Sequence, residues 1–141
     1  MHVEPDHIPR ELKVLESFIL WENFNRGDGK MSKTPVLSAG AKTPYDTAEA
    51  LMPFESAKEK LSKATDLGLG ISLLNGIKVN VGFHEGNLWC LDFDGFADSV
   101  TDNIDDGVME FIDAFPSYIE ISPSGTGFKY FFVCDRPPQS K

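Results

Sequence analysis

The second half of the chain has the pattern that most restricts the possible folds. An apolar strand is expected at residues 88–94 and an amphipathic helix at 102–115, and two further strands are expected at 118–122 and 128–134. The helix is indicated by apolar side chains at helical spacing on one face, and Pro116 follows its last turn. The sequence therefore predicts strand, helix, strand, strand, which requires a fold that mixes a sheet with a covering helix.

The first half of the chain is expected to supply shorter elements. Its signals predict, in order, a short helix at 8–12, a buried strand at 18–21, a polar loop from Asn25 to Lys33, extended chain at 34–36, a helix at 55–64 that ends in the glycines of 66–70, strands at 71–74 and 77–83 joined by a hairpin turn at Asn75-Gly76, and a turn at 84–87. These elements would form a helix and strand portion beside the second half, with a cleft between the two.

Together these elements predict an α/β fold, or α+β in a stricter vocabulary. The order from residue 88 onward is the beginning of a β-α-β-β-α-β unit of the ferredoxin or RRM-like type. Its closing helix and strand do not follow in this chain, so the unit is expected to be incomplete. Residues 1–135 are predicted to form one domain, and the proline-rich residues 136–141 a tail or linker.

The charge of the chain excludes one common class of function. It has 141 residues with 22 acidic and 13 basic side chains, for a net charge of −9. A protein that simply coats DNA is usually basic. The acidic balance permits an enzyme whose carboxylates hold cations, or a protein that binds basic partners.

Other residue classes suggest no further site. Cys90 and Cys134 lie in apolar runs without metal-ligand spacing, so they are predicted to be buried free thiols. His2, His7 and His84 are far apart in sequence and are predicted to lie on the surface. No stretch reaches the ~20 apolar residues that cross a membrane. These observations predict a cytoplasmic protein without membrane attachment.

The first candidate site is the pair Asp92 and Asp94 at the end of an apolar strand. Alternate side chains of a strand share a face, so the two carboxylates are expected on the same side of the sheet. Mg²⁺ prefers one or two carboxylates with water and substrate phosphates. The alternative interpretation is that the strand ends at Asp92 and both acids are simply solvated.

The second candidate site is the segment Glu120–Lys129, whose sequence is EISPSGTGFK. Two glycines flanked by hydroxyl side chains form a turn whose backbone N–H groups can converge on an anion, and Lys129 can add a positive charge. Alternation predicts that Glu120 and Ser122 face a cleft, while Ile119 and Ile121 face the core. An ordinary glycine-rich hairpin with a surface lysine is the alternative.

Taken in order, these two motifs resemble a known family. A hydrophobic strand that ends in DxD, followed by a helix and an SPSGxG segment, is similar to the bifunctional primase-polymerase domains of phages and plasmids, within the archaeo-eukaryotic primase superfamily. Trp21, the segment Lys33-Thr34-Pro35 and the segment Gly68-Leu69-Gly70 match upstream features of that family in the same order. The resemblance covers about Ile8 to Val133, and its most specific part is SPSGTG.

The resemblance implies a set of roles. Asp92 and Asp94 would bind Mg²⁺ or Mn²⁺, and Lys129 would take the place of the family's phosphate-contacting histidine as a catalytic residue. The nucleotide-binding residues would be Ser122, Ser124, Gly125, Thr126, Gly127, Lys129 and Lys33. The expected activity is nucleotidyl transfer for DNA priming or polymerisation in the replication of a mobile element. Its partners would be a dNTP or NTP, single-stranded or primer-template DNA, and a replicative helicase domain or protein.

Two departures from the family pattern leave the enzyme assignment open. Lysine replaces the family histidine at position 129 and cannot shuttle protons near neutral pH. The third catalytic acid that normally follows the glycine loop is not found, because only Asp135 follows Lys129. The alternative function is a non-catalytic relative that binds nucleotide, nucleic acid or a partner protein, in the extreme case as an inhibitor. An unrelated α/β domain with coincidental motifs is the remaining interpretation.

Overall fold

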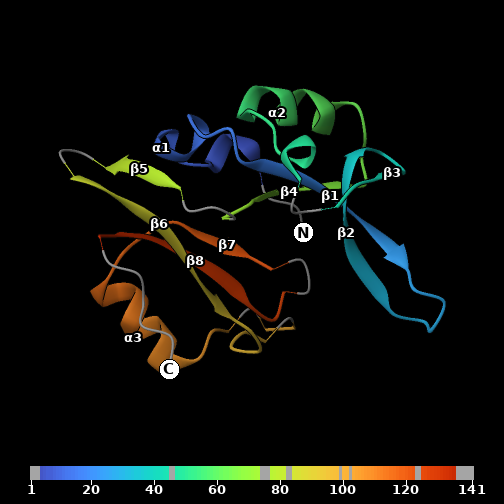
Figure 1. Cartoon of the computed structure of the whole chain (residues 1–141). Helices are drawn as coiled ribbons and strands as arrows, with labels where there is room; N and C mark the ends of the chain where they lie inside the picture. The colour runs from blue at the N-terminus through green and yellow to red at the C-terminus, as the bar shows by residue number, and fades with distance from the viewer. Residues whose placement is uncertain are drawn as a thin grey trace. The chain divides into compact units, whose positions relative to one another are not determined.

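The chain is mixed α+β, with two antiparallel four-stranded sheets and three α-helices among the described residues (Figure 1). The structure is a computed structural model that describes residues 4–44, 47–73, 77–81, 84–98, 100–101, 103–122 and 125–135, with the side chain of His84 left out. The chain divides into two compact units, His2–Asn75 and Gly76–Lys141, which are called here the N-terminal and C-terminal units.

The N-terminal unit is built on a sheet in the order β3-β2-β1-β4. Its elements are η1 (Pro5–His7), α1 (Arg10–Lys13), β1 (Phe18–Asn25), β2 (Met31–Ser38), β3 (Ala41–Lys42), η2 (Ala48–Ala50), α2 (Phe54–Ser62) and β4 (Leu67–Ile71). The start of β1 packs against α2, where the Phe18 and Phe54 rings lie 5.3 Å apart between centroids. Phe18, Leu20 and Val36 are fully buried there.

Two expectations for the N-terminal unit are wrong in detail. The polar loop is shorter than expected, because β2 already begins at Met31 and therefore contains Lys33. Arg26 N–H donates to Lys30 C=O, and positive φ angles at Gly27 and Gly29 let the chain reverse within five residues. The glycines of 66–70 do not end the preceding helix but lie in β4, which pairs with β1.

The C-terminal unit contains β5 (Lys78–Val81), β6 (His84–Phe93), α3 (Asp106–Ala114), β7 (Ile119–Ile121) and β8 (Phe128–Cys134). Its sheet has the order β5-β6-β8-β7, and every neighbouring pair is antiparallel. Because β6 and β7 are each antiparallel to β8, they run parallel to one another with α3 as their connection. This is the split β-α-β arrangement expected from the sequence, and β5 adds a fourth strand beside β6.

The predicted hairpin of strands 71–74 and 77–83 is wrong, because β4 pairs with β1 and β5 pairs with β6. The two strands thus belong to different sheets, and Asn75-Gly76 lie outside the described residues. The turn expected at 84–87 is also misplaced, since β6 begins at His84, opposite Val81. An Asn-Gly dipeptide reports local turn preference only, whereas strand pairing depends on distant residues.

The core of the C-terminal unit is aromatic. Phe93 stacks on Phe128 with ring centroids 4.8 Å apart, and Phe111 of α3 lies 6.0 Å from Phe93 and 5.2 Å from Tyr130. Helix α3 therefore covers this face of the sheet (Figure 1). The aromatic run of β8 is buried at Phe128, Tyr130 and Phe131, so these rings belong to the core of the unit.

Helix α3 begins later than expected. Asp105 is its N-cap, and the Asp105 carboxylate accepts hydrogen bonds from Gly107 N–H and Val108 N–H at 3.0 and 3.3 Å. A capping carboxylate satisfies donors that the first turn leaves unpaired. Asp102, the expected first residue, lies outside the described part of the chain. At the other end Phe115 is the C-cap residue of the helix. Its side chain is exposed, although it was expected to be the last residue of the helix, whose apolar face packs on the sheet.

Three smaller expectations have mixed outcomes. His7 is exposed, as expected, and lies 3.4 Å from Glu4, whereas His2 and the tail 136–141 are outside the described residues. Cys90 and Cys134 are free but only half-buried, rather than fully buried. Across the described residues, no helix is both long enough and apolar enough to span a membrane.

Candidate functional site

The two aspartates of the DxD motif lie where β6 ends. Asp92 is the penultimate residue of the strand, and Asp94 follows its last residue, Phe93. Both carboxylates are exposed. The alternative interpretation, in which both acids are simply solvated, is therefore correct in one respect, because both carboxylates are open to water. Exposure is also what a cation that keeps several waters requires.

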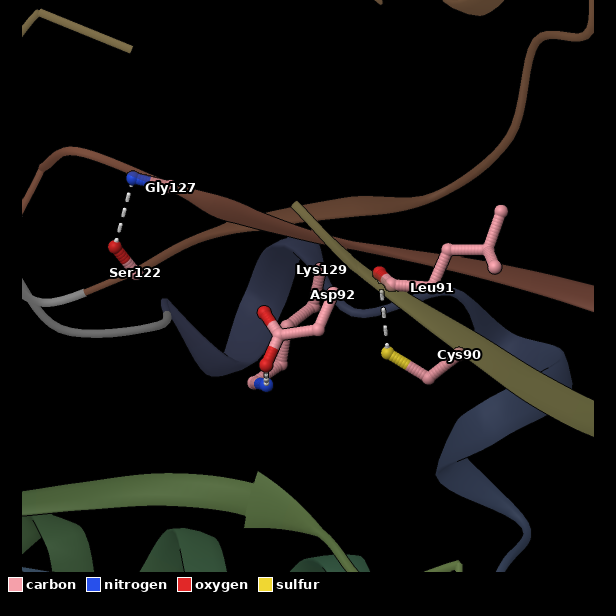
Figure 2. A network of polar contacts seen from close by, with 6 residues as sticks. All are labelled: Cys90, Leu91, Asp92, Ser122, Gly127 and Lys129. Carbon is pink, nitrogen blue, oxygen red and sulfur yellow. Dashed lines mark hydrogen bonds and ion pairs between the residues drawn. The ribbon is translucent and has the colours of Figure 1, made fainter. Parts of the chain in front are cut away.

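Lys129 contacts the first of these aspartates. Lys129 lies opposite Asp92 in the β6–β8 register, and its Nζ is 2.9 Å from Asp92 Oδ2. Figure 2 shows both side chains on the same side of the sheet. The side chain of Asp92 is 63% exposed and that of Lys129 is 42% exposed, so the ion pair contributes at most about 1 kcal/mol to stability. Its importance is positional, because it joins a residue of the DxD motif to one that follows the glycine loop.

Gly127 brings the same two segments into closer contact. A Cβ at this position would lie 2.5 Å from the Phe93 carbonyl oxygen and 3.2 Å from Asp94 Cα. Only a residue without a side chain can approach the backbone this closely. The second glycine of the loop is therefore required for the loop to pack against the strand end that carries Asp94.

The glycine loop is held by hydrogen bonds of its own. Ser122 N–H donates to Gly127 C=O at 2.8 Å, while Ser122 Oγ accepts from Gly127 N–H at 3.1 Å (Figure 2). Ser122 C=O accepts from Gly125 N–H at 2.8 Å, and Gly125 has a positive φ. Ser124 lies outside the described residues. A phosphate at this loop would therefore compete with Ser122 for the Gly125 and Gly127 donors, or bind through other groups.

A shallow, open depression of about 700 Å³ lies beside the loop. Thr126 contributes to it and accepts a hydrogen bond at its C=O from Ala97 N–H. The other lining residues follow the DxD motif, namely Gly95, Phe96, Ala97, Asp98, Asn103, Ile104 and Asp105. The carboxylate of Asp98 accepts from Val100 N–H and Thr101 N–H, which lowers the pKa of Asp98 and stabilises the turn.

Lys33 belongs to the N-terminal unit, where the three upstream motifs meet. The Trp21 indole lies across Gly68 so closely that a Cβ there would be 2.1 Å from the ring. Trp21 Nε1 donates to Leu69 C=O at 3.3 Å, and Lys33 Nζ lies 5.2 Å from a Trp21 ring centroid. The glycines of β4 thus make room for the indole, and the lysine lies within cation–π distance of it.

Glu120 is the residue that sequence analysis placed in the cleft without giving it a role. It lies opposite Lys129 in the β7–β8 register, so Glu120 and Asp92 flank Lys129 on neighbouring strands. Tyr118 hydroxyl donates to Glu120 Oε1 at 3.0 Å. Burial raises the pKa of Glu120, while the Tyr118 hydrogen bond and the Lys129 charge act in the opposite direction.

The burial expected for β7 is wrong in part. Ile121 was expected in the core but is 48% exposed, whereas Glu120 is partly buried. Among the described strands, β7 is a short edge strand that pairs with β8 alone, and Ile121 is its last residue. The Glu120–Lys129 pairing could have been identified from sequence. The two strands of a hairpin are antiparallel, so residues at equal distances on either side of the glycine turn lie opposite one another.

Cys90 lies on the same face as Asp92, and its reactivity can be predicted. Burial raises the pKa of the Cys90 thiol from 9.0 to about 11, with Lys129 acting in the opposite direction. Because only the thiolate reacts, native Cys90 should be alkylated by iodoacetamide at pH 8 on the order of 100-fold more slowly than in urea. The measurement uses a Cys134→Ser variant, and the native rate should keep rising up to about pH 11. A rate that levels off near pH 9 would contradict the prediction.

The described residues contain no cluster of three or more His, Cys, Asp or Glu side chains arranged to hold a metal ion. The donors present near the loop are the two carboxylates of Asp92 and Asp94, which match the oxygen ligands that Mg²⁺ and Mn²⁺ prefer. No protein-family model matches the chain, and a search of curated proteins found no match.

Proposed function

We propose that this chain is a primase-polymerase type domain that binds a metal–nucleotide complex and acts as a nucleotidyltransferase in DNA priming or polymerisation. One observation carries the proposal: Gly127 and Lys129, on either side of Phe128, contact Asp94 and Asp92, on either side of Phe93. Residues that are 33 and 37 positions apart in sequence, Asp94 with Gly127 and Asp92 with Lys129, therefore meet at one end of a sheet. Carboxylates next to a glycine turn and a lysine form a suitable environment for a cation and a phosphate.

Each side chain has a specific role in this proposal. Asp92 and Asp94 hold Mg²⁺ or Mn²⁺, which would neutralise charge on the phosphates during transfer. Lys129 contacts a phosphate oxygen as a point charge and does not act as a proton shuttle. Ser122 closes the glycine loop, because its hydroxyl oxygen accepts a hydrogen bond from Gly127 N–H. Single-stranded or primer-template DNA would supply the template, and a helicase domain would be a partner in replication.

The second candidate function is a non-catalytic domain that binds nucleotide, nucleic acid or a partner protein. The Asp92–Lys129 ion pair favours it, because a protein cation already neutralises one of the two carboxylates. In this case the loop and the ion pair would be structural features of the sheet end. The two functions differ in whether nucleotide binding depends on a divalent cation.

The test is calorimetric titration of dATP with Mn²⁺ into the wild-type chain and into Asp92→Asn/Asp94→Asn. We expect Mn²⁺-dependent binding by the wild type and its loss in the double variant, because asparagine keeps the shape but removes both charges. Glu110→Gln/Asp113→Asn on α3 is the matched control, since it changes the net charge equally and should bind as the wild type does. A folded wild type that binds no dATP with Mn²⁺ would favour the second function.

A further inference from the structure

Three charged residues form one row across the C-terminal sheet. Glu120 on β7, Lys129 on β8 and Asp92 on β6 are direct partners in the strand registers. Side chains directly opposite on neighbouring antiparallel strands have Cβ atoms about 4.5–5.5 Å apart. The Lys129 side chain, with its flexible four-carbon stem, therefore has one carboxylate on each side.

In this structure Lys129 is paired with only one of its two neighbours. Its Nζ lies 2.9 Å from Asp92 Oδ2, whereas Glu120 accepts a hydrogen bond from the Tyr118 hydroxyl. Glu120 is the more buried of the two acids. Burial without a directly bonded cation disfavours its ionised form, and the nearby Lys129 charge partly offsets this effect on the Glu120 pKa.

A divalent cation at Asp92 would change the balance within the row. The cation and the Lys129 ammonium would compete for the same carboxylate, and their like charges would repel each other. Lys129 would then gain by moving towards Glu120, whose carboxylate is still available to a cation. A lysine without a second acidic neighbour would have to remain near the metal or enter water.

We propose that Glu120 is a positioning residue for Lys129, which receives the Lys129 ammonium when a divalent cation binds Asp92. The proposal rests on the proposed function in one respect, namely that Asp92 binds such a cation. It assigns a role to Glu120, which flanks Lys129 on the side opposite Asp92 and does not itself hold the metal. Lys129 then stays in a defined place beside the loop instead of blocking the metal site.

The test is a double-variant cycle of Mn²⁺ binding, without nucleotide, measured by electron paramagnetic resonance at low ionic strength. Lys129→Met removes the competitor and should tighten Mn²⁺ binding roughly two- to fivefold, the range expected for an exposed ion pair. Glu120→Gln removes the second anchor and should weaken binding by a similar factor. In the Lys129→Met background, Glu120→Gln should have no effect, because there is no ammonium left to position.

Controls separate this role from a general effect of charge or folding. Glu85→Gln removes the same charge from another cross-strand pair of this sheet, Lys78–Glu85, and should leave Mn²⁺ binding unchanged. Thermal unfolding should confirm that each variant is folded. Glutamine keeps the shape of Glu120 and an acceptor for Tyr118, so Glu120→Gln should preserve that contact.

The outcomes distinguish this inference from the proposed function. One result would overturn the positioning role but not the metal site. In that result Asp92→Asn abolishes Mn²⁺ binding, while Glu120→Gln changes it equally whether Lys129 is present or replaced by methionine. An absence of any effect of Glu120→Gln would do the same. A wild type that binds no Mn²⁺, or binds it equally well after Asp92→Asn, would overturn both.

Discussion

Replacing Gly127 with alanine is expected to destabilise the C-terminal unit by about 3 kcal/mol and to abolish Mn²⁺-dependent dATP binding. The added Cβ would lie 2.5 Å from the Phe93 carbonyl oxygen, and the atoms that it meets are all backbone. A flexible side chain could rotate away, whereas here either the loop or the end of β6 must move. Moving either one separates the glycine loop from Asp94.

The measurement combines urea unfolding with calorimetry of dATP and Mn²⁺. Gly70→Ala is the matched control, because its Cβ would meet the nearest atom, Ile19 Cγ2, at 3.4 Å, which is ordinary contact. It should unfold within about 1 kcal/mol of the wild type. If Gly127→Ala were as stable as Gly70→Ala and still bound the nucleotide, the close approach of the loop to β6 would not be needed for the site.

Replacing Phe128 with alanine is expected to lower the free energy of unfolding by about 3–5 kcal/mol. Phe128 is 1% exposed and stacks on Phe93 at 4.8 Å, so its loss leaves a cavity beside the Phe93 ring. Its sequence neighbours are Gly127, which directly precedes β8, and Lys129, and both contact the DxD motif. The core and the candidate site therefore share one strand, and damage to the core should also weaken the site.

Urea unfolding followed by circular dichroism measures this effect. Ile121→Ala provides the contrast, because Ile121 lies opposite Phe128 in the register but is 48% exposed. We expect it to cost less than about 1 kcal/mol. Equal losses in the two variants would mean that the stacked ring is no better packed than the exposed edge of the sheet.

Local signals in the sequence were sufficient to identify several helices and strands of both units. The last strand was predicted at 128–134 and observed at Phe128–Cys134, and α2 and α3 were predicted with errors of a few residues at their ends. Such elements are recognised from side-chain periodicity and from prolines and glycines nearby, all within one short segment. The strand, helix, strand, strand order of the C-terminal unit followed from the same local patterns.

The pairing of strands could not be predicted in the same way. Strands β4 and β5 follow one another with an Asn-Gly dipeptide between them, yet β4 pairs with β1 and β5 with β6. The glycines of β4 show the reason, because Gly68 provides the space that the Trp21 ring fills. That requirement comes from a residue 47 positions away, and no local pattern contains it.

Some residues of the candidate site were predicted from the sequence, whereas the contacts between them were shown by the tertiary structure. Residue types and short spacings alone identified Asp92, Asp94 and the glycine loop, because alternation along a strand and the conformational freedom of glycine are local properties. Only the tertiary structure showed that Gly127 packs on the Phe93–Asp94 backbone and that Lys129 pairs with Asp92, which places Asp92 in one row with the Glu120–Lys129 pair. These contacts arise from the register between strands, which is set by the packing of the whole sheet against α3.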